Sequence, residues 1–262
     1  MRFLFVLALL YTPWCASADK ALLDFSNIQE KKSQMVSSRI ILAVIEATTE
    51  AYEFSYEGRD FIVYPHVYSP QIFPSTFYYA QAIDIEPGQS FLEIGSGTGL
   101  LAITAALRGA NPVVATDISP IAVDNTSENV RRYDLEGIVQ VREGSVFDPL
   151  KEGETFDIIL WNVPYMHIDK TDLSPIETAL YDPFYNSLTR FFAEAKKYLK
   201  PGGKILFGAS TTHMHQDVLQ KLVDTYGWSV KIIVDKTVDL PPVEGGAPAL
   251  NVQLCEAVPV QN

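Results

Sequence analysis

The sequence predicts a doubly wound α/β fold, in which helices cover both faces of a mainly parallel sheet of seven strands. The first observation is that apolar, strand-like runs alternate with helix-like stretches from Gln89 to the C-terminal region. This alternation is typical of βαβ crossovers, which build parallel sheets. The second observation is a glycine-rich turn, Gly95 to Gly99, directly after the first of these runs. Such turns bind nucleotide-like ligands, because backbone without side chains allows close approach.

Strands are expected where apolar and β-branched residues run together, and helices where longer stretches with a helical period lie between them. The expected strands are 90–94, 112–117, 138–143, 156–161, 204–209, 229–234 and 251–257. The expected helices are 99–108, 120–133, 182–199 and 215–226. Lys200-Pro201-Gly202-Gly203 predicts a helix end followed by a turn, and residues 241–246 predict a loop before the last strand.

The first residues predict a targeting segment. Met1-Arg2 precedes an unbroken apolar stretch from Phe3 to Tyr11, and Ala16-Ser17-Ala18 offers a small-x-small cleavage site. The apolar stretch is about half as long as a membrane-spanning helix requires, so no stable membrane span is expected. Residues 1–18 are therefore predicted to be a signal peptide that is cleaved after Ala18 and directs export. Without a functional signal the protein would be cytoplasmic.

Residues 19–64 predict a small N-terminal appendage, and residues 65–262 the main domain. The appendage is expected to contain a helix within 26–52 and a hairpin whose strands, 52–56 and 60–64, flank Glu57-Gly58-Arg59. The main domain begins with a proline-rich segment that is unsuited to a helix or a central strand. This segment leads into a helix expected over 75–83, with Ser75 as its N-cap.

The charge balance disfavours nucleic acid as a partner. The chain of 262 residues has 20 Lys and Arg against 32 Asp and Glu, a formal net charge of −12, and its basic residues never run longer than two. Binding to a phosphate backbone normally requires clustered Lys and Arg. Cleavage after Ala18 would remove Cys15 and leave Cys255 as the only thiol, so an internal disulfide is not expected.

The most specific pattern is Phe91-Leu92-Glu93-Ile94-Gly95-Ser96-Gly97-Thr98-Gly99, with Asp117 closing the next expected strand. The spacing G-x-G-x-G differs from the dinucleotide spacing G-x-G-x-x-G, and a carboxylate such as Asp117 can accept hydrogen bonds from a ribose diol. The combination resembles class I S-adenosylmethionine-dependent methyltransferases. The residues alone leave open a nicotinamide-binding domain or a simple tight turn.

The resemblance implies a Rossmann-like methyltransferase sheet and S-adenosyl-L-methionine as the cofactor. The cofactor-binding residues that it implies are Thr76, Glu93, Gly95, Ser96, Gly97, Gly99, Asp117, Ile118, Ser145, Val146 and Asn162. Ser145 departs from the family pattern, which usually has an acidic residue that accepts a hydrogen bond from the adenine amino group. A serine hydroxyl can accept such a bond but carries no charge.

Trp161-Asn162-Val163-Pro164-Tyr165 closes the fourth expected strand and resembles the N-x-P-[YF] signature of methyltransferases that act on planar nitrogens. A conjugated nitrogen is a poor nucleophile, because its lone pair is delocalised. The Asn162 carbonyl oxygen and the backbone carbonyl of Val163 or Pro164 can accept its two N–H groups, which favours the positive charge that develops during methyl transfer. Tyr165 can stack on the planar group. Asn162, Pro164 and Tyr165 are therefore the predicted catalytic residues.

The sequence thus predicts an S-adenosylmethionine-dependent N-methyltransferase that acts on a planar amide or amino nitrogen. The acidity of the chain favours a protein glutamine, toward which the prediction leans, whereas the valine of the signature resembles the adenine N6 enzymes. The alternatives are a small-molecule acceptor, an RNA adenine and a non-catalytic cofactor-binding protein. No metal site is predicted, since the spacing of the candidate ligands matches no zinc or calcium pattern: Asp169, Asp172, Glu177, His213 and His215.

Overall fold

The computed structural model describes residue 23, residues 32–239 and residues 249–261. The predicted signal peptide, residues 1–18, and the loop predicted over 241–246 lie outside these residues. No helix within the described ranges is long and apolar enough to cross a membrane.

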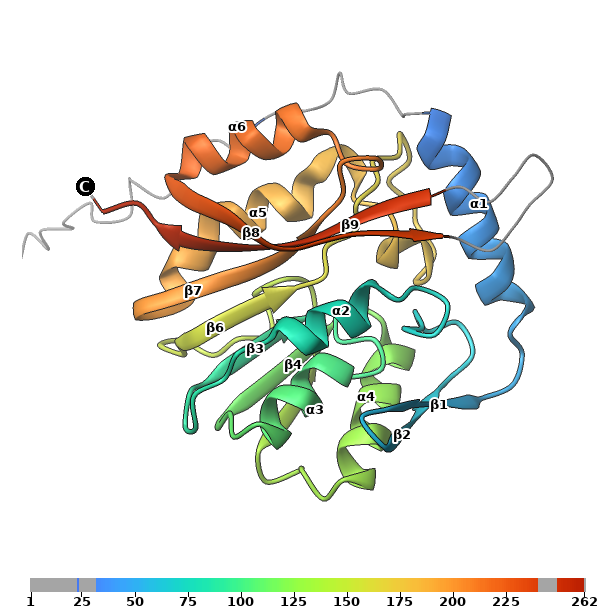
Figure 1. Cartoon of the computed structure of the whole chain (residues 1–262), viewed down its shortest axis with the longest axis horizontal. Coiled ribbons are helices and arrows are strands. Elements are labelled where there is room, and N and C mark those ends of the chain that lie inside the picture. Colours follow the sequence, from blue (N-terminus) through green and yellow to red (C-terminus); the bar gives the residue numbers. More distant parts are fainter. Residues whose placement is uncertain (1–22, 24–31, 240–248, 262) are drawn as a thin grey trace, which may run out of the picture.

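A seven-stranded sheet with the strand order β5-β4-β3-β6-β7-β9-β8 forms the centre of the molecule (Figure 1). Five strands are parallel to one another, and β9 runs antiparallel to β7 and to β8. This arrangement confirms the predicted mainly parallel sheet. The strand bounds are β3 Phe91–Ile94, β4 Val113–Asp117, β5 Val139–Glu143, β6 Phe156–Trp161, β7 Leu199–Ala209, β8 Trp228–Asp239 and β9 Ala249–Pro259.

The chain order reverses at β3 and β6, and this reversal creates the place for a site. From β3 the chain continues outward to β4 and β5, and then returns to the other side of β3 as β6. In open α/β sheets, ligands bind outside the carboxyl ends of the strands at such a switch point. The glycine-rich turn follows β3 and Asn162 follows β6, so the fold brings the two predicted motifs to the same edge.

Helices cover both faces of the sheet. The helix bounds are α1 Lys32–Ala47, α2 Ser75–Ala82, α3 Leu100–Leu107, α4 Pro120–Arg132, α5 Asn186–Glu194 and α6 Gln216–Tyr226. Figure 1 shows α2, α3 and α4 on one side of the sheet, and α5 and α6 on the other. Two buried apolar clusters correspond to these two layers. The doubly wound arrangement that the alternation predicts is therefore present.

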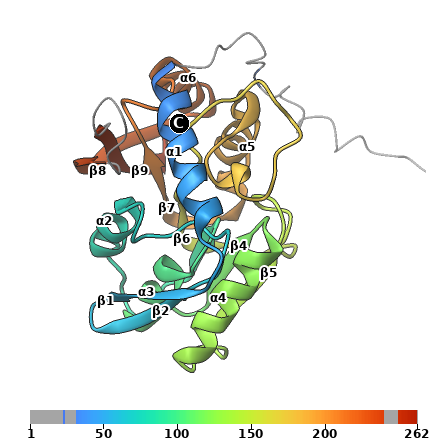
Figure 2. The same ribbon diagram turned by 90° about the vertical axis from the view of Figure 1, so that its right-hand side faces the viewer.

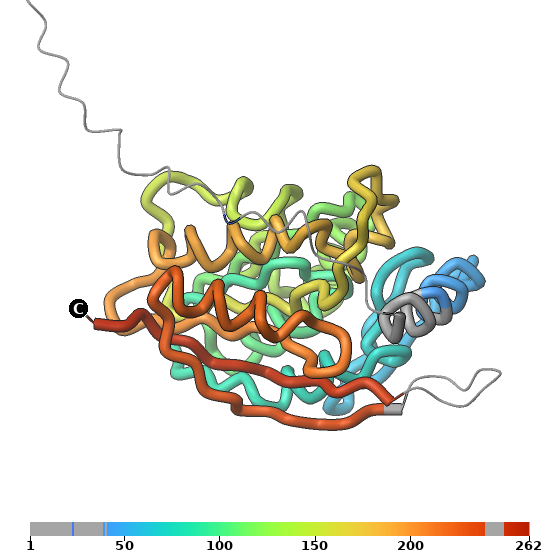
Figure 3. Tube along the Cα trace, turned by 90° about the horizontal axis from the view of Figure 1, so that it is seen from above, coloured from blue at the N-terminus to red at the C-terminus, as the bar shows by residue number. Residues whose placement is uncertain are grey.

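The N-terminal segment reaches two separate parts of the domain. The hairpin of β1 (Tyr52–Tyr56) and β2 (Arg59–Val63) is tied to α4, because the Asn129 amide contacts the backbone N–H and C=O of Ile62 at 2.9 Å each. Helix α1 lies across the carboxyl ends of the parallel strands (Figure 2). Figure 3 shows α1 and the hairpin at the end of the molecule opposite to the C-terminus.

Two local predictions are wrong. Ser75 is the first residue of α2 and is buried, whereas the N-cap is Pro74 without a side-chain hydrogen bond. The helix predicted over 182–199 is broken, because Phe184 and Tyr185 adopt positive φ angles of 53° and 51°. The regular helix α5 therefore begins only at Asn186, and 3-10 turns flank it.

The last three strands are longer than the sequence predicts. The turn expected at Lys200-Pro201-Gly202-Gly203 lies within β7 as an irregularity: Leu199 pairs with Phe156, and Lys204 pairs with Ile158. Strands β8 and β9 extend beyond their expected ends, because they pair with each other as a long antiparallel ladder.

Candidate active site

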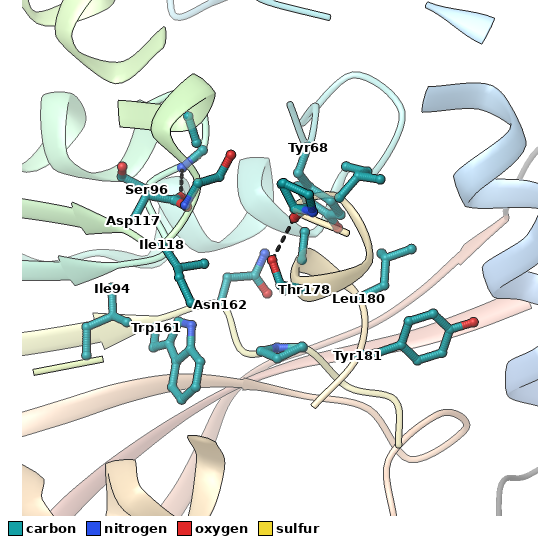
Figure 4. A pocket seen from close by; sticks show the side chains of 18 of the residues that line it. Tyr68, Ile94, Ser96, Asp117, Ile118, Trp161, Asn162, Thr178, Leu180 and Tyr181 are labelled. Carbon is teal, nitrogen blue, oxygen red and sulfur yellow. Dashed lines mark hydrogen bonds between the residues drawn. The ribbon is translucent and has the colours of Figure 1, made fainter. Parts of the chain in front are cut away.

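A cavity of about 320 Å³ opens at the carboxyl ends of the parallel strands. Its two sides differ in composition. One side, here the glycine side, consists of residues 93–98 and the residues that follow β4 and β5. The other, here the tyrosine side, consists of residues from 66–76, Tyr165 and the loop 166–183. Asn162 stands between Ile118 of the glycine side and Thr178 of the tyrosine side (Figure 4).

The glycine side begins with a turn that a buried carboxylate fastens to the following helix. Glu93 is 2% exposed, and its carboxylate accepts a hydrogen bond of 2.8 Å from the backbone N–H of Ala102 in α3. Burial raises the pKa of Glu93 well above its usual value, although the Ala102 N–H opposes that shift. Gly95 and Gly97 line the cavity at positive φ, which favours glycine. A Cβ atom at Gly95 would lie 3.2 Å from the Trp161 ring nitrogen.

Gly99 is the one predicted cofactor residue that does not line the cavity. It is the N-cap of α3 with φ 76°, and a Cβ atom there would lie 2.8 Å from the methyl group of Thr126 in α4. The glycine is required because two helices pack closely at this point. Its role in cofactor binding stays a prediction.

Asp117 ends β4 and connects the strand to the glycine turn. One of its carboxylate oxygens accepts a hydrogen bond of 2.9 Å from the Gly97 N–H, and the other accepts one of 2.9 Å from the Ser119 N–H. Burial raises the pKa of Asp117, and these backbone donors oppose the shift. Each oxygen keeps a second lone pair, so both can still accept a hydrogen bond from a ribose diol.

The remaining predicted cofactor residues also line the glycine side or its boundary. They are Thr76, Ser96, Ile118, Ser145, Val146 and Asn162. Ile118 is 51% exposed and offers an apolar surface beside Asp117. These features fit the parts of S-adenosylmethionine. The apolar Ile118 side chain suits the adenine ring, the buried Asp117 carboxylate suits the ribose, and the glycine-rich turn suits the methionine part.

The residues predicted to be catalytic form a hydrogen-bonded cluster at the end of β6. Asn162, Pro164 and Tyr165 all line the cavity. The Tyr165 hydroxyl oxygen lies 3.0 Å from Asn162 Oδ1 and 2.7 Å from the hydroxyl oxygen of Tyr79 in α2. Burial raises the pKa of Tyr165 to about 12, so its hydroxyl keeps its proton at neutral pH. The sequence predicts only a stacking role for Tyr165, whereas the structure shows that it also contacts Asn162.

A second tyrosine fixes the backbone of this cluster from the other side of the sheet. Tyr185 is fully buried, and its hydroxyl donates a hydrogen bond of 3.1 Å to the backbone carbonyl of Tyr165. The same hydroxyl accepts a hydrogen bond of 3.1 Å from the His215 N–H. The turn after β6 is therefore held between α2 and the start of α6.

The rest of the tyrosine side is apolar, and the sequence analysis missed most of it. Tyr68 and Phe73 stack with ring centroids 4.6 Å apart. Further lining side chains are Ile41 of α1, Met166, Leu173, Ile176 and Leu180 of the loop, and Leu250 of β9. Among the described residues that line the cavity, none is Lys or Arg. The proline-rich spacing indicates an unusual segment at 65–74, but the other residues carry no local signal.

The acidic residues of the loop and the two histidines between β7 and α6 are not arranged as a metal site. Within residues 32–239 and 249–261, no group of three or more His, Cys, Asp or Glu side chains is arranged to hold a metal ion. His213 does line the cavity, and it is only 4% exposed.

The sheet topology is that of class I methyltransferases, and the lining of the glycine side fits S-adenosylmethionine. The chain belongs to the methyltransferase small domain family, whose model matches residues 59–231. This family agrees with the predicted catalytic class and cofactor.

Individual relatives are similar over part of the chain. A ribosomal protein L11 methyltransferase of Geobacillus thermodenitrificans is 30% identical over 152 residues, which cover 57% of this chain and 42% of that protein. The chain therefore spans less than half of that relative. A Methanocaldococcus jannaschii protein, provisionally named a protein N5-glutamine methyltransferase, is 30% identical over 182 residues, which cover 67% of this chain and 88% of that protein. A release factor glutamine methyltransferase of Clostridium acetobutylicum is 28% identical over 206 residues, which cover 72% of this chain and 66% of that protein.

Solved structures support the fold. A precorrin 8w decarboxylase of Methanobacterium thermoautotrophicum matches with a TM-score of 0.52 and 19% identity, over 76% of this chain and 96% of that one. An S-adenosylmethionine-dependent methyltransferase of Agrobacterium tumefaciens matches with a TM-score of 0.54 and 17% identity, over 81% and 71%. At such low identity these likenesses concern architecture and not the substrate.

Proposed function

We propose that this protein transfers a methyl group to a planar amide nitrogen, and that the acceptor is the side chain of a protein glutamine. The observation that carries the proposal is the position of Asn162. It directly follows β6, lines the cavity between the glycine turn and the apolar tyrosine side, and is the hydrogen-bonding end of an Asn-x-Pro-Tyr turn. A nitrogen held by Asn162 would face the cofactor side directly.

The chain's own residues act by binding and orientation. When bound, S-adenosylmethionine supplies a methyl group on a positively charged sulfur, and Asp117 and the glycine turn would hold its ribose and chain. Asn162 accepts an N–H of the acceptor, which orients the nitrogen lone pair toward the glycine side and favours the charge that builds up there. The acceptor nitrogen would take this methyl group, sulfur would keep the electron pair of the broken carbon–sulfur bond, and the surplus N–H proton would leave to water.

Two features support an amide acceptor over a charged one. The lining of the tyrosine side contains no cationic side chain among its described residues, so it suits a neutral group. The net charge of −12 disfavours a nucleic acid. The glutamine assignment is further supported by the Clostridium and Methanocaldococcus relatives, whose names state glutamine methylation. The apolar lining also favours a second candidate, a small neutral molecule that carries an amide or aromatic amine.

One experiment separates these acceptors. The purified protein is incubated with methyl-labelled S-adenosylmethionine and a whole-cell extract, which is then divided into protein, RNA and small-molecule fractions. We expect label in the protein fraction. In Asn162→Ala the rate of methyl transfer should fall about 100-fold or more, as for removal of a group that stabilises developing charge. Affinity for S-adenosylhomocysteine, measured by calorimetry, should change less than about twofold.

The other possible results of the labelling experiment each lead to a different conclusion. Label in the small-molecule fraction alone would select the second candidate. Label in RNA alone would contradict the argument from charge. Full transfer by Asn162→Ala would remove Asn162 from the reaction.

A further inference from the structure

Four oxygen atoms form a continuous chain from the site into the sheet. The Asn162 Oδ1 atom lies 3.0 Å from the Tyr165 hydroxyl oxygen, which lies 2.7 Å from the Tyr79 hydroxyl oxygen. The Tyr79 oxygen lies in turn 2.8 Å from the backbone carbonyl oxygen of Gln253 in β9. Tyr165 and Tyr79 are 8% and 0% exposed, and both contacts of the Tyr79 hydroxyl are buried away from water.

This row of four oxygens has fewer hydrogen-bonding protons than oxygen–oxygen contacts. It has three oxygen–oxygen contacts, each of which requires one proton between its atoms. The Asn162 carbonyl and the Gln253 carbonyl only accept, and each tyrosine hydroxyl provides one proton. Burial raises the pKa of both tyrosines, which keeps both protons in place but adds none. One buried contact would therefore bring two oxygens together without a hydrogen, which is costly in a dry interior.

Turning the Asn162 amide by half a turn removes this deficit. The amide nitrogen would then occupy the position beside Tyr165 and supply the third proton. Asn162 would donate to Tyr165, Tyr165 to Tyr79, and Tyr79 to the Gln253 carbonyl, so every donor points the same way. On the opposite side, Thr76 Oγ1 lies 3.5 Å from the other end of the amide, and its hydroxyl can donate to an oxygen as readily as accept from a nitrogen.

A second observation, from the shape of the site, requires the same orientation. A Cβ atom at Gly208 in β7 would lie 2.8 Å from the amide atom beside Tyr165, so that atom is enclosed by the sheet. The opposite end of the amide lies on the side of Thr76, which lines the cavity. Only this end can meet an acceptor, and it must be the oxygen if it is to accept an N–H.

We propose that Tyr79, with the Gln253 backbone carbonyl, is a positioning residue that sets the orientation of the Asn162 amide through Tyr165, so that the carbonyl oxygen of Asn162 faces the acceptor. The inference rests on the proposed function, because the direction of the amide matters only if Asn162 holds an N–H donor. Tyr79 itself is fully buried and touches neither the cavity nor the acceptor.

The first test measures hydrogen exchange of the Asn162 side-chain amide by nitrogen-15 NMR, in the complex with S-adenosylhomocysteine. The amide signals are assigned by their loss in Asn162→Asp. With the nitrogen beside Tyr165, Tyr165→Phe should accelerate exchange of one amide proton about tenfold or more, as expected for loss of one hydrogen bond in a buried site. Thr76→Val should leave it within about twofold. The opposite pattern, sensitivity to Thr76→Val alone, would overturn the inference.

The second test is a double-mutant comparison of methyl transfer to the labelled fraction identified above. In Tyr79→Phe, the Tyr165 hydroxyl loses its acceptor and its proton can turn to Asn162, which holds the amide in the unproductive orientation. We expect kcat to fall about tenfold. In Tyr79→Phe/Tyr165→Phe nothing holds the amide in that orientation, so kcat should rise again, about threefold above the single variant. Tyr78→Phe, on the same helix, is the matched control and should match the wild type.

The outcomes also separate this inference from the proposed function. Thermal unfolding of each variant shows whether the fold is kept. A merely structural role of the tyrosines predicts that the double variant is no faster than Tyr79→Phe, and that result would overturn the inference even if Asn162→Ala abolishes transfer. The exchange test requires no acceptor, so its result stands if the acceptor proves to be a small molecule.

Discussion

The glycine side of the cavity presents mainly backbone, whereas the tyrosine side presents side chains from four separate segments. On the glycine side the contacts link neighbouring turns, as between Asp117 and Gly97. On the tyrosine side a single row of contacts connects α2, the turn after β6 and β9, over a sequence separation of up to 174 residues. Under the proposed function, the cofactor would be held by contacts between turns that are close in the sequence. The acceptor would be held by contacts between distant segments, which exist only in the folded protein.

The largest effect should come from Gly208→Ala. This substitution tests whether the tyrosine side can be disturbed while the glycine side still binds the cofactor. The new Cβ would lie 2.8 Å from the Asn162 amide and 3.1 Å from the Tyr165 hydroxyl oxygen, so the cluster must shift. We expect methyl transfer to fall about 100-fold, as for a displacement of a positioning group. Calorimetry should show nearly unchanged affinity for S-adenosylhomocysteine.

Gly137→Ala is the control, because a Cβ there meets nothing within 4 Å and its backbone is not in the left-handed region. If Gly208→Ala reduced the affinity for S-adenosylhomocysteine as much as it slowed methyl transfer, the glycine side and the tyrosine side would not act independently.

A smaller effect is expected from Asp117→Ala, which tests the glycine side. Loss of the carboxylate removes the acceptor for two backbone N–H groups and for the ribose diol. Affinity for S-adenosylhomocysteine should decrease about tenfold or more, since hydrogen bonds to charged groups contribute about 1.5–3 kcal/mol. At saturating cofactor, kcat should remain close to the wild-type value.

Asp148→Ala is the matched control, because this carboxylate is exposed and pairs with Arg190. Unchanged affinity in Asp117→Ala would place the ribose elsewhere.

The smallest effect concerns the stability of the loop on the tyrosine side. Asp182 accepts hydrogen bonds of 3.0 and 2.8 Å from the N–H groups of Ser187 and Leu188, at the start of α5. Burial raises its pKa from 3.8 to about 6. Between about pH 4 and pH 6 the unfolded chain has lost this proton while the folded protein keeps it. The contribution of Asp182 to the free energy of unfolding therefore decreases as the pH rises through this window.

Urea unfolding of Asp182→Asn and wild type from pH 4 to pH 7 measures this contribution. The wild type should lose stability relative to the variant as the pH rises to about 6, and the difference should then stay constant. Asp148→Asn should show a dependence of opposite sign near pH 4, because Arg190 lowers the pKa of Asp148. A difference that does not vary with pH would show that Asp182 titrates normally in the folded protein.

Several features could be predicted from the sequence because they depend on neighbouring residues. Alternating runs of apolar residues predict the sheet and its helices, and a strand followed by glycines and a later carboxylate predicts the cofactor side. Tertiary contacts add constraints that local patterns do not show. Gly99 is predicted as a cofactor residue, and its packing against Thr126 of another helix independently requires a glycine there. The predicted helix over 182–199 is interrupted by Tyr185, whose hydroxyl bonds to residues of two other segments.

The sequence by itself determined the α/β class, the glycine turn with Asp117 and the Asn-x-Pro-Tyr turn, because each depends on residue types at short spacing. Only the tertiary structure decided that Tyr79, Gly208 and Gln253 form one cluster with Tyr165 and Asn162. These residues come from three different elements, and they meet because the sheet order places β7 between β6 and β9 and because α2 packs against β9. Contacts between such distant residues leave no periodic or spacing pattern in a single sequence.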